Sequence, residues 1–434
     1  MIRKAARLRG RLALLACLAM IGPAVAACGS GHSGSGSGSG SGVELQFWTI
    51  NLKGGYQSYI EDSIHAYQKS HPGTHIQWTD IPDFEQTQTK LLAAIAGGAA
   101  PDVVNMTPFI LPQFVSANAV YSIGDLTSNL SAVQQKYVPS LWDAGVVGGK
   151  AYAIPYYGSV SALIYNAKLF RQAGLDPAKP PTTWPQVFQD ARVIYKKTRV
   201  SGFAQTLDNF DDAGNPADIL AGEAGVPLLN GSGKQAAFNT PQAANFLSNY
   251  VQGMKQGWID KISATGAVMD SAQALAQGST AMVFMGPWIL HWLKSNTNQS
   301  TYQNFRIADH PVGDGGAANA FLQDFAIPRA SAHPKQALSF AQYMASTSLE
   351  LAKQAPVLPA LVSQTKNPYF QSSEATKVLV DQNMKFYWPK IAPVADLFDA
   401  LKNQFEAAYL GKSTPQQALS AAAKQWDQIL ATKS

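Results

Sequence analysis

Cysteine and charge are both scarce in this chain of 434 residues. It has two cysteines, Cys17 and Cys28, and charged residues make up 14% of the chain. The body from Val43 onward contains neither cysteine. A disulfide within it is therefore excluded, and its stability must come from packing. No hydrophobic run beyond the N-terminal one approaches the length of a membrane span.

What is present favours a well-packed body of two lobes. Hydrophobic residues make up 46% of the chain and aromatic residues 10%. From Val43 to Ser434 there are about 390 residues, which is more than one hydrophobic core usually spans. We therefore expect two lobes in this part of the chain.

The first 42 residues form an export signal and a tether. An apolar run from Leu12 to Val25 follows a basic head and ends at Ala26-Ala27-Cys28, the layout of a signal peptide over residues 1–27. The small residues before Cys28 resemble the bacterial lipobox, in which that cysteine is acylated. Residues 29–42 are almost all Gly and Ser, a flexible coil with a reach of about 20 Å. We expect an exported protein, anchored by lipid to the outer face of the cell membrane. The basic head contains Arg3, Lys4, Arg7, Arg9 and Arg11.

The positive net charge belongs to the export signal. Removal of residues 1–27 leaves 28 Lys and Arg residues against 28 Asp and Glu residues. The mature chain is then neutral, so the formal charge of +5 does not indicate a nucleic-acid partner.

The motifs of common enzymes are missing. Gly411-Lys412-Ser413 has Glu406 where a phosphate-binding loop needs its first glycine. The formal G-x-G-x-x-G match at Gly29, Gly31 and Gly34 falls in the tether, and G-x-S-x-G and H-E-x-x-H are absent. We therefore expect no catalytic residues and no cofactor.

A metal site is also not expected. The histidines at positions 65, 71 and 75 straddle a helix end and a Pro-Gly turn, which favours a solvated surface over a metal site. The aspartate-rich stretch 208–212 lacks the spacing of an EF-hand calcium loop.

The hydrophobic pattern predicts alternating strands and helices. Strands are expected at 45–50, 74–79 and 102–106, with helices between them, which favours a parallel α/β sheet. Further strands are expected at 152–155, 162–165 and 280–285, and the C-terminal third reads as mostly helical. Gly158-Ser159 lies between two of these strands and reads as flexible.

Ligands of open α/β sheets bind beyond the carboxyl ends of the strands. Aromatic, amide and carboxylate side chains gather there, with few cations, which suits a neutral polyhydroxylated ligand: ring faces stack on aromatics and hydroxyls bond to Asp, Asn and Gln. The candidates are Trp48, Asn51, Lys53, Phe84, Asn105, Thr107, Tyr157, Asp208, Asn209 and Trp288.

Structural roles are the alternatives for several of these residues. Trp48 is within a strand and suits the core equally well, and Lys53 suits a solvated helix start. Asp208 and Asn209 suit a solvated loop. Trp288 follows a buried strand and opens a helix, where a core role and a ligand role are both open.

Several stretches, in this order, resemble the extracellular solute-binding proteins of ABC sugar importers, the class of maltose-binding protein. They are 45–76, 91–104, 151–177, 181–192, 274–290 and 411–430. The resemblance implies a hinged, two-lobe type II fold, with a mostly parallel sheet and flanking helices in each lobe. Lobe one would take 43–157 and 313–365, and lobe two 158–312 and 366–434. Gly158-Ser159 would be one crossing between the lobes. Trp48, Asn51, Lys53, Asn105, Thr107 and Trp288 would line the cleft, with Trp288 as a stacking platform.

Two stretches depart from the family pattern. Many members have a Gly-Gly pair before the strand that re-enters lobe one, whereas this chain reads Phe321-Leu322-Gln323-Asp324-Phe325. Gln323 and Asp324 are therefore candidate ligand contacts. The stretch 386–389 is unusually aromatic, and its Trp388 is either a wall of the site or a cap on the helices beneath.

The leading hypothesis is a monomeric, lipid-anchored protein that binds a mono- or oligosaccharide and delivers it to a membrane permease. A second hypothesis is a binder of a glycerophosphodiester or another charged solute, which would need an anion site. The strand-end loops contain Lys53 but no arginine. The third hypothesis is an enzyme acting on extracellular glycans.

Overall fold

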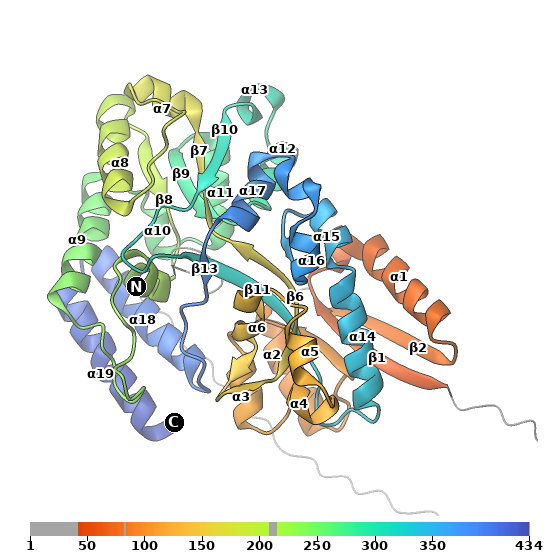
Figure 1. The fold of residues 1–434 in the computed structure, drawn as a ribbon. Helices are drawn as coiled ribbons and strands as arrows, with labels where there is room; N and C mark the ends of the chain where they lie inside the picture. Colours follow the sequence, from red (N-terminus) through yellow and green to blue (C-terminus); the bar gives the residue numbers. More distant parts are fainter. Residues whose placement is uncertain (1–41, 82–83, 208–214, 434) are drawn as a thin grey trace, which may run out of the picture. The chain divides into compact units, whose positions relative to one another are not determined.

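Two main β-sheets organise the structure, a computed structural model that describes residues 42–81, 84–207 and 215–433 (Figure 1). The chain from Gly42 onward forms one compact unit. A small additional hairpin pairs β4 (Val146–Val147) with β5 (Lys150–Ala151). The mixture of helices and sheets confirms the predicted α/β class.

The larger sheet has the strand order β12-β6-β11-β3-β1-β2, with β13 paired to β11. β1 pairs in parallel with β2 and β3, whereas β11 runs antiparallel to both β3 and β6. The bounds are β1 Val43–Ile50, β2 Thr74–Ile81, β3 Val103–Met106, β6 Ala153–Val160, β11 Ala318–Ala326, β12 Leu358–Pro359 and β13 Met384–Lys385.

The smaller sheet has the order β10-β7-β9-β8. β8 is parallel to β9, and β7 is antiparallel to both β9 and β10. Both sheets thus mix parallel and antiparallel pairs and are not mostly parallel as predicted. β7 and β11 each follow a strand of the other sheet, and they run antiparallel to β9 and β10 and to β3 and β6 respectively. The bounds are β7 Ala162–Asn166, β8 Ser201–Ala204, β9 Thr280–Met285 and β10 Phe305–Asp309.

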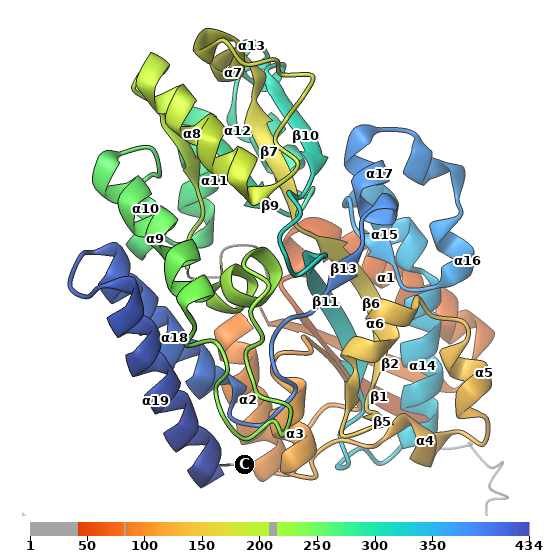
Figure 2. The ribbon, with the colours of Figure 1, turned by 60° about the vertical axis from the view of Figure 1, so that its left-hand side comes forward.

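The chain crosses from the larger to the smaller sheet at Ser161, between β6 and β7 (Figure 2). Gly158 and Ser159 were predicted to be a flexible crossing, but both are buried within β6 and pair with Leu322 and Phe321 of β11. A Cβ on Gly158 would lie 2.7 Å from Leu141 Cδ2, so this glycine allows close packing rather than flexibility.

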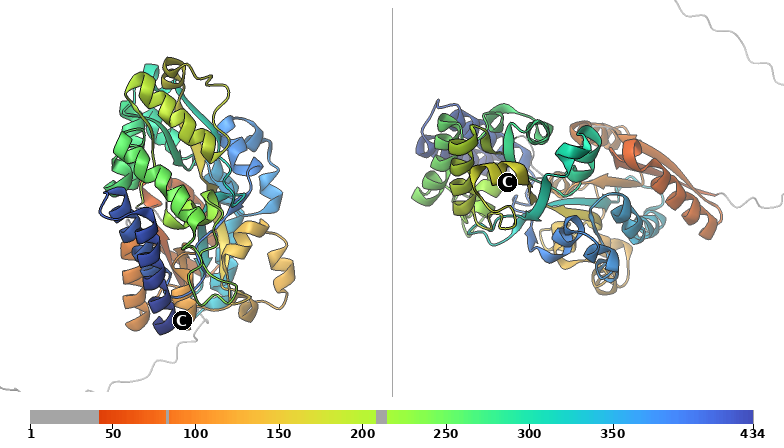
Figure 3. Two further views of the ribbon diagram at one scale, coloured as in Figure 1. Left: turned by 90° about the vertical axis from the view of Figure 1, so that its left-hand side faces the viewer. Right: turned by 90° about the horizontal axis from the view of Figure 1, so that it is seen from above.

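Helices cover both sheets. Around the larger sheet lie α1 Lys53–Ser70, α2 Phe84–Ala96, α3 Leu111–Ser116, α4 Ile123–Leu126, α5 Leu130–Gln134, α6 Pro139–Ala144, α14 Pro334–Ser346, α15 Ser348–Gln354, α16 Val362–Thr365 and the 3₁₀-helix η2 Pro368–Gln371. The others are α7 Ala167–Ala173, α8 Trp184–Thr198, the π-helix η1 Asp218–Glu223, α9 Pro241–Gln256, α10 Ile262–Thr265, α11 Val268–Gln277, α12 Ile289–Asn296, α13 Gln299–Tyr302, α17 Glu374–Asp381, α18 Val394–Tyr409 and α19 Pro415–Lys433. The last two helices pack side by side (Figures 2 and 3).

Aromatic side chains fill the core on each sheet. Phe47 of β1 makes edge contacts with Phe325 of β11 and Phe340 of α14, with ring centroids 5.6 and 5.0 Å apart. On the smaller sheet the fully buried Trp184 packs against Phe284 at 4.8 Å. Such contacts stabilise a body without disulfides. Among the described residues, no helix combines the length and apolar character needed to cross a membrane.

Candidate functional site

The loop after β1 is shaped by a carboxylate on the neighbouring strand. Asp80 of β2 accepts hydrogen bonds from the backbone amides of Leu52 (3.1 Å) and Lys53 (2.9 Å), at the start of α1. It also accepts a hydrogen bond from the Thr49 hydroxyl at 2.6 Å. A carboxylate at a helix N-terminus satisfies amides that have no partner within the helix. Asp80 was not among the sequence candidates, because its role depends on pairing between β1 and β2.

The three candidates of this loop differ in how much surface they offer. Asn51 is exposed and adopts a left-handed backbone conformation, with φ of +50°. Lys53 is also exposed, and its Nζ atom lies 5.7 Å from the centre of the Trp78 ring. Trp48 is half-buried and packs partly against the core.

The end of β3 and the middle of β11 bring four candidates together. Asn105 donates from Nδ2 to Gln323 Oε1 at 2.8 Å and to the backbone carbonyl of Asp324 at 3.1 Å. Thr107 follows directly after β3, and Met106 pairs with Asp324. We call this group the polar cluster. It consists of Asn105, Thr107, Gln323 and Asp324, each at most 4% exposed.

The polar cluster has hydrogen-bonding capacity that the protein does not use. Within the described part of the chain, Asn105 Oδ1, Thr107 Oγ1 and Asp324 Oδ2 have no hydrogen-bond partner. Burial raises the pKa of the Asp324 carboxyl well above its usual value, and the charge of Lys390 opposes that shift. Buried polar atoms are nearly always paired, so three orphaned atoms on adjacent strands indicate a place for water or ligand hydroxyls.

A register shift connects the polar cluster to an aromatic cavity. Gln323 pairs with Tyr157 of β6, whereas the next residue, Asp324, pairs with Pro155. Tyr157 itself lines a cavity of about 180 Å³ beside the sheet. The polar cluster and the cavity are therefore neighbours across one strand pair.

Residues from elements of both sheets line this cavity, which we call the aromatic cavity. Trp288 follows β9 of the smaller sheet, and the other residues come from α1, β6, β11 and the region of α15. Trp288 is half-buried, so part of its ring system remains available to a ligand. The lining residues are Leu52, Tyr56, Tyr157, Ser159, Trp288, Phe321, Leu351, Ala355 and Val357.

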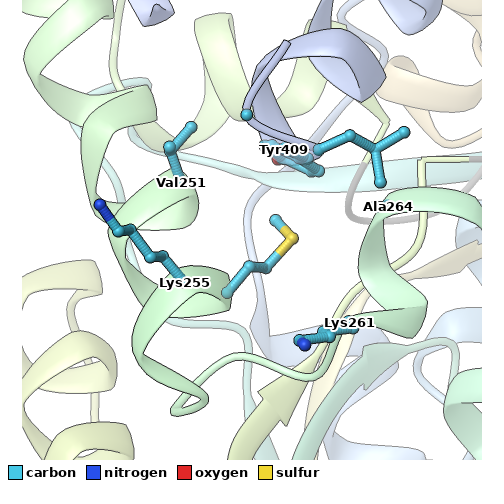
Figure 4. Close-up of a pocket in the computed structure, with 8 residues that line it drawn as sticks. Val251, Lys255, Lys261, Ala264 and Tyr409 are labelled. Carbon is cyan, nitrogen blue, oxygen red and sulfur yellow. The ribbon is translucent and has the colours of Figure 1, made fainter.

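A larger hollow of about 320 Å³ lies elsewhere, between α9, α10 and the end of α18 (Figure 4). Lys255 and Lys261 flank its mostly apolar wall, and Tyr409 lies beside it. None of the sequence candidates lines this hollow. Among its described lining residues it has one orphaned polar atom, the Tyr409 hydroxyl, and one aromatic ring, whereas the polar cluster has three orphaned atoms and the aromatic cavity has four aromatic side chains.

The remaining candidates do not join the site within the described structure. Trp388 is 2% exposed and packs edge-on against Phe109 (5.8 Å) and Phe398 (5.5 Å), which corresponds to the capping role rather than a wall. Phe84 begins α2, but its side chain lies outside the described part. Cys28, Asp208 and Asn209 also lie outside the described residues.

A buried network near the second sheet was not predicted. Glu223, in the π-helix η1, accepts hydrogen bonds from Gln205 Nε2 at 2.8 Å and from the Tyr250 hydroxyl at 2.5 Å. Burial raises the pKa of Glu223 well above its usual value, and the charge of Asp218 adds to this. These residues come from distant parts of the chain, and no sequence signal identifies them.

The described residues contain no group of three or more His, Cys, Asp or Glu side chains suited to hold a metal ion. The histidines at 65, 71 and 75 are all exposed, and His71 stacks on Tyr67 with ring centroids 4.0 Å apart.

Comparison with known proteins identifies the family. Residues 49–349 match the model of the bacterial extracellular solute-binding proteins. The chain belongs to this family. The match confirms the resemblance stated above and, since the family is extracellular, agrees with an exported protein that binds a solute for an ABC transporter.

Individual relatives are distant but span most of the chain. The multiple sugar-binding protein of Streptococcus mutans is 22% identical over 359 residues, covering 77% of this chain and 78% of its own length. The sn-glycerol-3-phosphate-binding periplasmic protein of Yersinia pseudotuberculosis is 21% identical and covers 89% of this chain and 92% of its own. A crystal structure from Synechococcus sp. MITs9220, described as that of a "putative oligosaccharide periplasmic-binding protein", is 26% identical. It superimposes with a TM-score of 0.78 and covers 89% of this chain and 99% of its own.

Proposed function

We propose that this solute-binding protein captures a neutral sugar, a mono- or oligosaccharide, at the polar cluster and against Trp288, and delivers it to a membrane permease. The sugar hydroxyls would bond to Asn105, Thr107 and Asp324. The C–H face of a sugar ring would lie on the accessible part of Trp288.

The observation that carries this proposal is the set of orphaned polar atoms. Asn105 Oδ1 and Asp324 Oδ2 are acceptors, and Thr107 Oγ1 both donates and accepts. Two acceptors beside one hydroxyl that both donates and accepts suit sugar hydroxyl groups, each of which does both. Leaving these atoms unpaired in a buried position costs free energy that a bound sugar would recover.

A charged solute is the second candidate, because one relative is named for binding sn-glycerol-3-phosphate. Phosphate recognition relies on arginines or on helix N-termini. No arginine or lysine lines the aromatic cavity, and none belongs to the polar cluster. These features favour the neutral ligand.

The arrangement of lobes and anchor completes the proposal. Lobe one would comprise 43–157 and 313–365, and lobe two 158–312 and 366–434, closing on the ligand by a hinge motion.

Residues 1–27 would direct export, and acylation of Cys28 would hold a monomer near its permease through the tether 29–42. Mass spectrometry of the membrane-bound protein tests the acyl group, and Cys28→Ser should release the protein from the cell.

A melting screen of residues 42–434 against sugars and phosphorylated solutes tests the function. Some neutral sugar should raise the melting temperature, bind reversibly in calorimetry and emerge chemically unchanged. Stabilisation by sn-glycerol 3-phosphate alone would establish the charged-solute alternative, and turnover of a sugar would establish an enzyme.

A pair of threonine variants separates binding from stability. Thr107→Val removes a buried hydroxyl that has no partner among the described residues, so it should weaken sugar binding and leave stability nearly unchanged. Thr376→Val is the control, because the Thr376 hydroxyl donates to the Ser373 carbonyl at 3.0 Å at the start of α17, and Thr376 is neither in the polar cluster nor among the residues that line the aromatic cavity. This variant should lower stability and leave binding unchanged.

A further inference from the structure

Apart from Trp288, on whose accessible face the sugar ring would lie, the walls of the aromatic cavity are poorly suited to a sugar. Eight of its nine lining residues have aliphatic or aromatic side chains, and Ser159 is the exception. Sugar hydroxyls pressed against Leu351, Ala355 and Val357 would lose water without gaining hydrogen bonds, which opposes binding. The cavity and the polar cluster therefore suit different parts of a ligand.

The size of the cavity corresponds to one ring. Its volume is about 180 Å³. An apolar cavity of about 150 Å³ in another protein stays dry and binds benzene. The aromatic faces of Tyr56, Tyr157 and Phe321 make this cavity suitable for a flat apolar ring.

Ser159 supplies one polar contact in this apolar setting. It is 1% exposed, it lines the cavity, and its Oγ atom has no hydrogen-bond partner in the described part of the chain. It lies on β6 two residues from Tyr157, which pairs with Gln323 of the polar cluster. Ser159 pairs with Phe321, so it lies further along β6 from the polar cluster than Tyr157 does, and its hydroxyl would meet a polar substituent of a ring held in the cavity.

We propose that the ligand is a glycoside with an aryl group, whose ring fills the aromatic cavity while its sugar occupies the polar cluster. This proposal rests on the proposed function and specifies its substrate class. Because Trp288 comes from the smaller sheet and the other walls from the larger one, the ring contacts both parts of the protein when bound.

The test compares matched sugars by calorimetry on residues 42–434. The probes are glucose, galactose, mannose and xylose, with their methyl and phenyl glycosides in both anomers. The phenyl glycoside of at least one sugar should bind at least tenfold more tightly than its methyl glycoside. Equal affinities of the phenyl and methyl glycosides of a sugar that binds would overturn this inference while the proposed function stands. If no free sugar or glycoside binds, the proposed function fails as well.

Filling the cavity provides the second arm. Ala355→Phe places a ring in the cavity, so it should abolish the preference for phenyl over methyl glycosides and leave the affinity for the free sugar within about threefold. Ala264→Phe is the matched control, since Ala264 is also buried and lines the hollow of Figure 4. It should keep the phenyl preference. If Ala355→Phe does not fold, Ala355→Leu gives the same comparison with a smaller side chain. A phenyl preference that survives both cavity-filling variants would overturn the assignment.

Discussion

Truncation of Trp288 gives the sharpest single-residue test of the proposed binding site. Trp288 lies at the start of α12, directly after β9, and is half-buried against the core around the larger sheet. Trp288→Ala would remove the platform offered to the sugar and open one wall of the aromatic cavity. The question is how much affinity should be lost.

The expected loss follows from area. An aromatic side chain buries about 150–250 Å² in full contact, so a half-buried tryptophan offers a ligand about 100 Å². At about 25 cal/mol per Å² this contributes about 2.5 kcal/mol, or about a 70-fold change in dissociation constant. Isothermal titration calorimetry with the sugar found in the melting screen measures this change directly.

Trp292→Ala provides the matched control. Trp292 lies one turn further along α12, is also half-buried and does not line the cavity. It should lose stability to a similar extent and keep its affinity. If Trp288→Ala folds and its dissociation constant for the sugar is within about threefold of the wild-type value, Trp288 is a core residue and its proposed stacking role is wrong.

Three further predictions concern buried groups. Burial lowers the pKa of His310 from 6.5 to about 3, so its contribution to stability is present above pH 6.5 and is lost as the pH falls. Between pH 7 and pH 5 the wild type should lose about 2 kcal/mol more unfolding free energy in urea than His310→Phe, and parallel pH profiles would contradict this. Because the pKa of Asp324 is raised, its carboxyl costs stability as the pH rises through the folded-state pKa. The stability of Asp324→Asn relative to the wild type should therefore be greater at pH 8 than at pH 5. This variant should also bind sugar about tenfold more weakly. An equal stability difference between variant and wild type at pH 5 and pH 8 would contradict the pH prediction. Gly158→Ala should lose about 1–3 kcal/mol, since its Cβ would lie 2.7 Å from Leu141 Cδ2, whereas Gly54→Ala, with nothing within 4 Å, should cost nothing. Equal melting temperatures for the two glycine variants would contradict the packing argument.

Local elements could be predicted well because their signals are local. The run TAMVFM was predicted as a buried strand, and β9 has these same bounds, Thr280–Met285. Gly278, just before this strand, caps α11 in the left-handed conformation with φ of 74°. A short continuous apolar run and a glycine at a helix end can be recognised without knowledge of the rest of the chain.

Features that depend on long-range pairing could not be predicted in the same way. Gly158-Ser159 has a flexible composition, yet pairing with β11, more than 150 residues later, makes it part of a buried strand. The antiparallel pairing of β11 with β3, and the hydrogen bond that Asp80 accepts at the start of α1, likewise depend on which strands are neighbours in the sheet.

The candidate site shows the same division. Asn105, Thr107, Gln323 and Asp324 were each candidates, but their grouping depends on β3 and β11 being neighbours. Trp388 was a candidate that does not join the site. An aromatic stretch in the sequence does not show whether its rings face a ligand or pack against other rings, as Trp388 does against Phe109 and Phe398. Tyr56 and Phe321 of the aromatic cavity were not singled out as ligand contacts, since both also suit the core.

A crystal structure of the protein with the sugar from the melting screen tests the central claim most directly. It should place sugar hydroxyls within hydrogen-bonding distance of Asn105 Oδ1 and Asp324 Oδ2, with a ring face on Trp288. A sugar bound elsewhere, for example in the hollow of Figure 4, with the polar cluster filled only by water, would contradict the account.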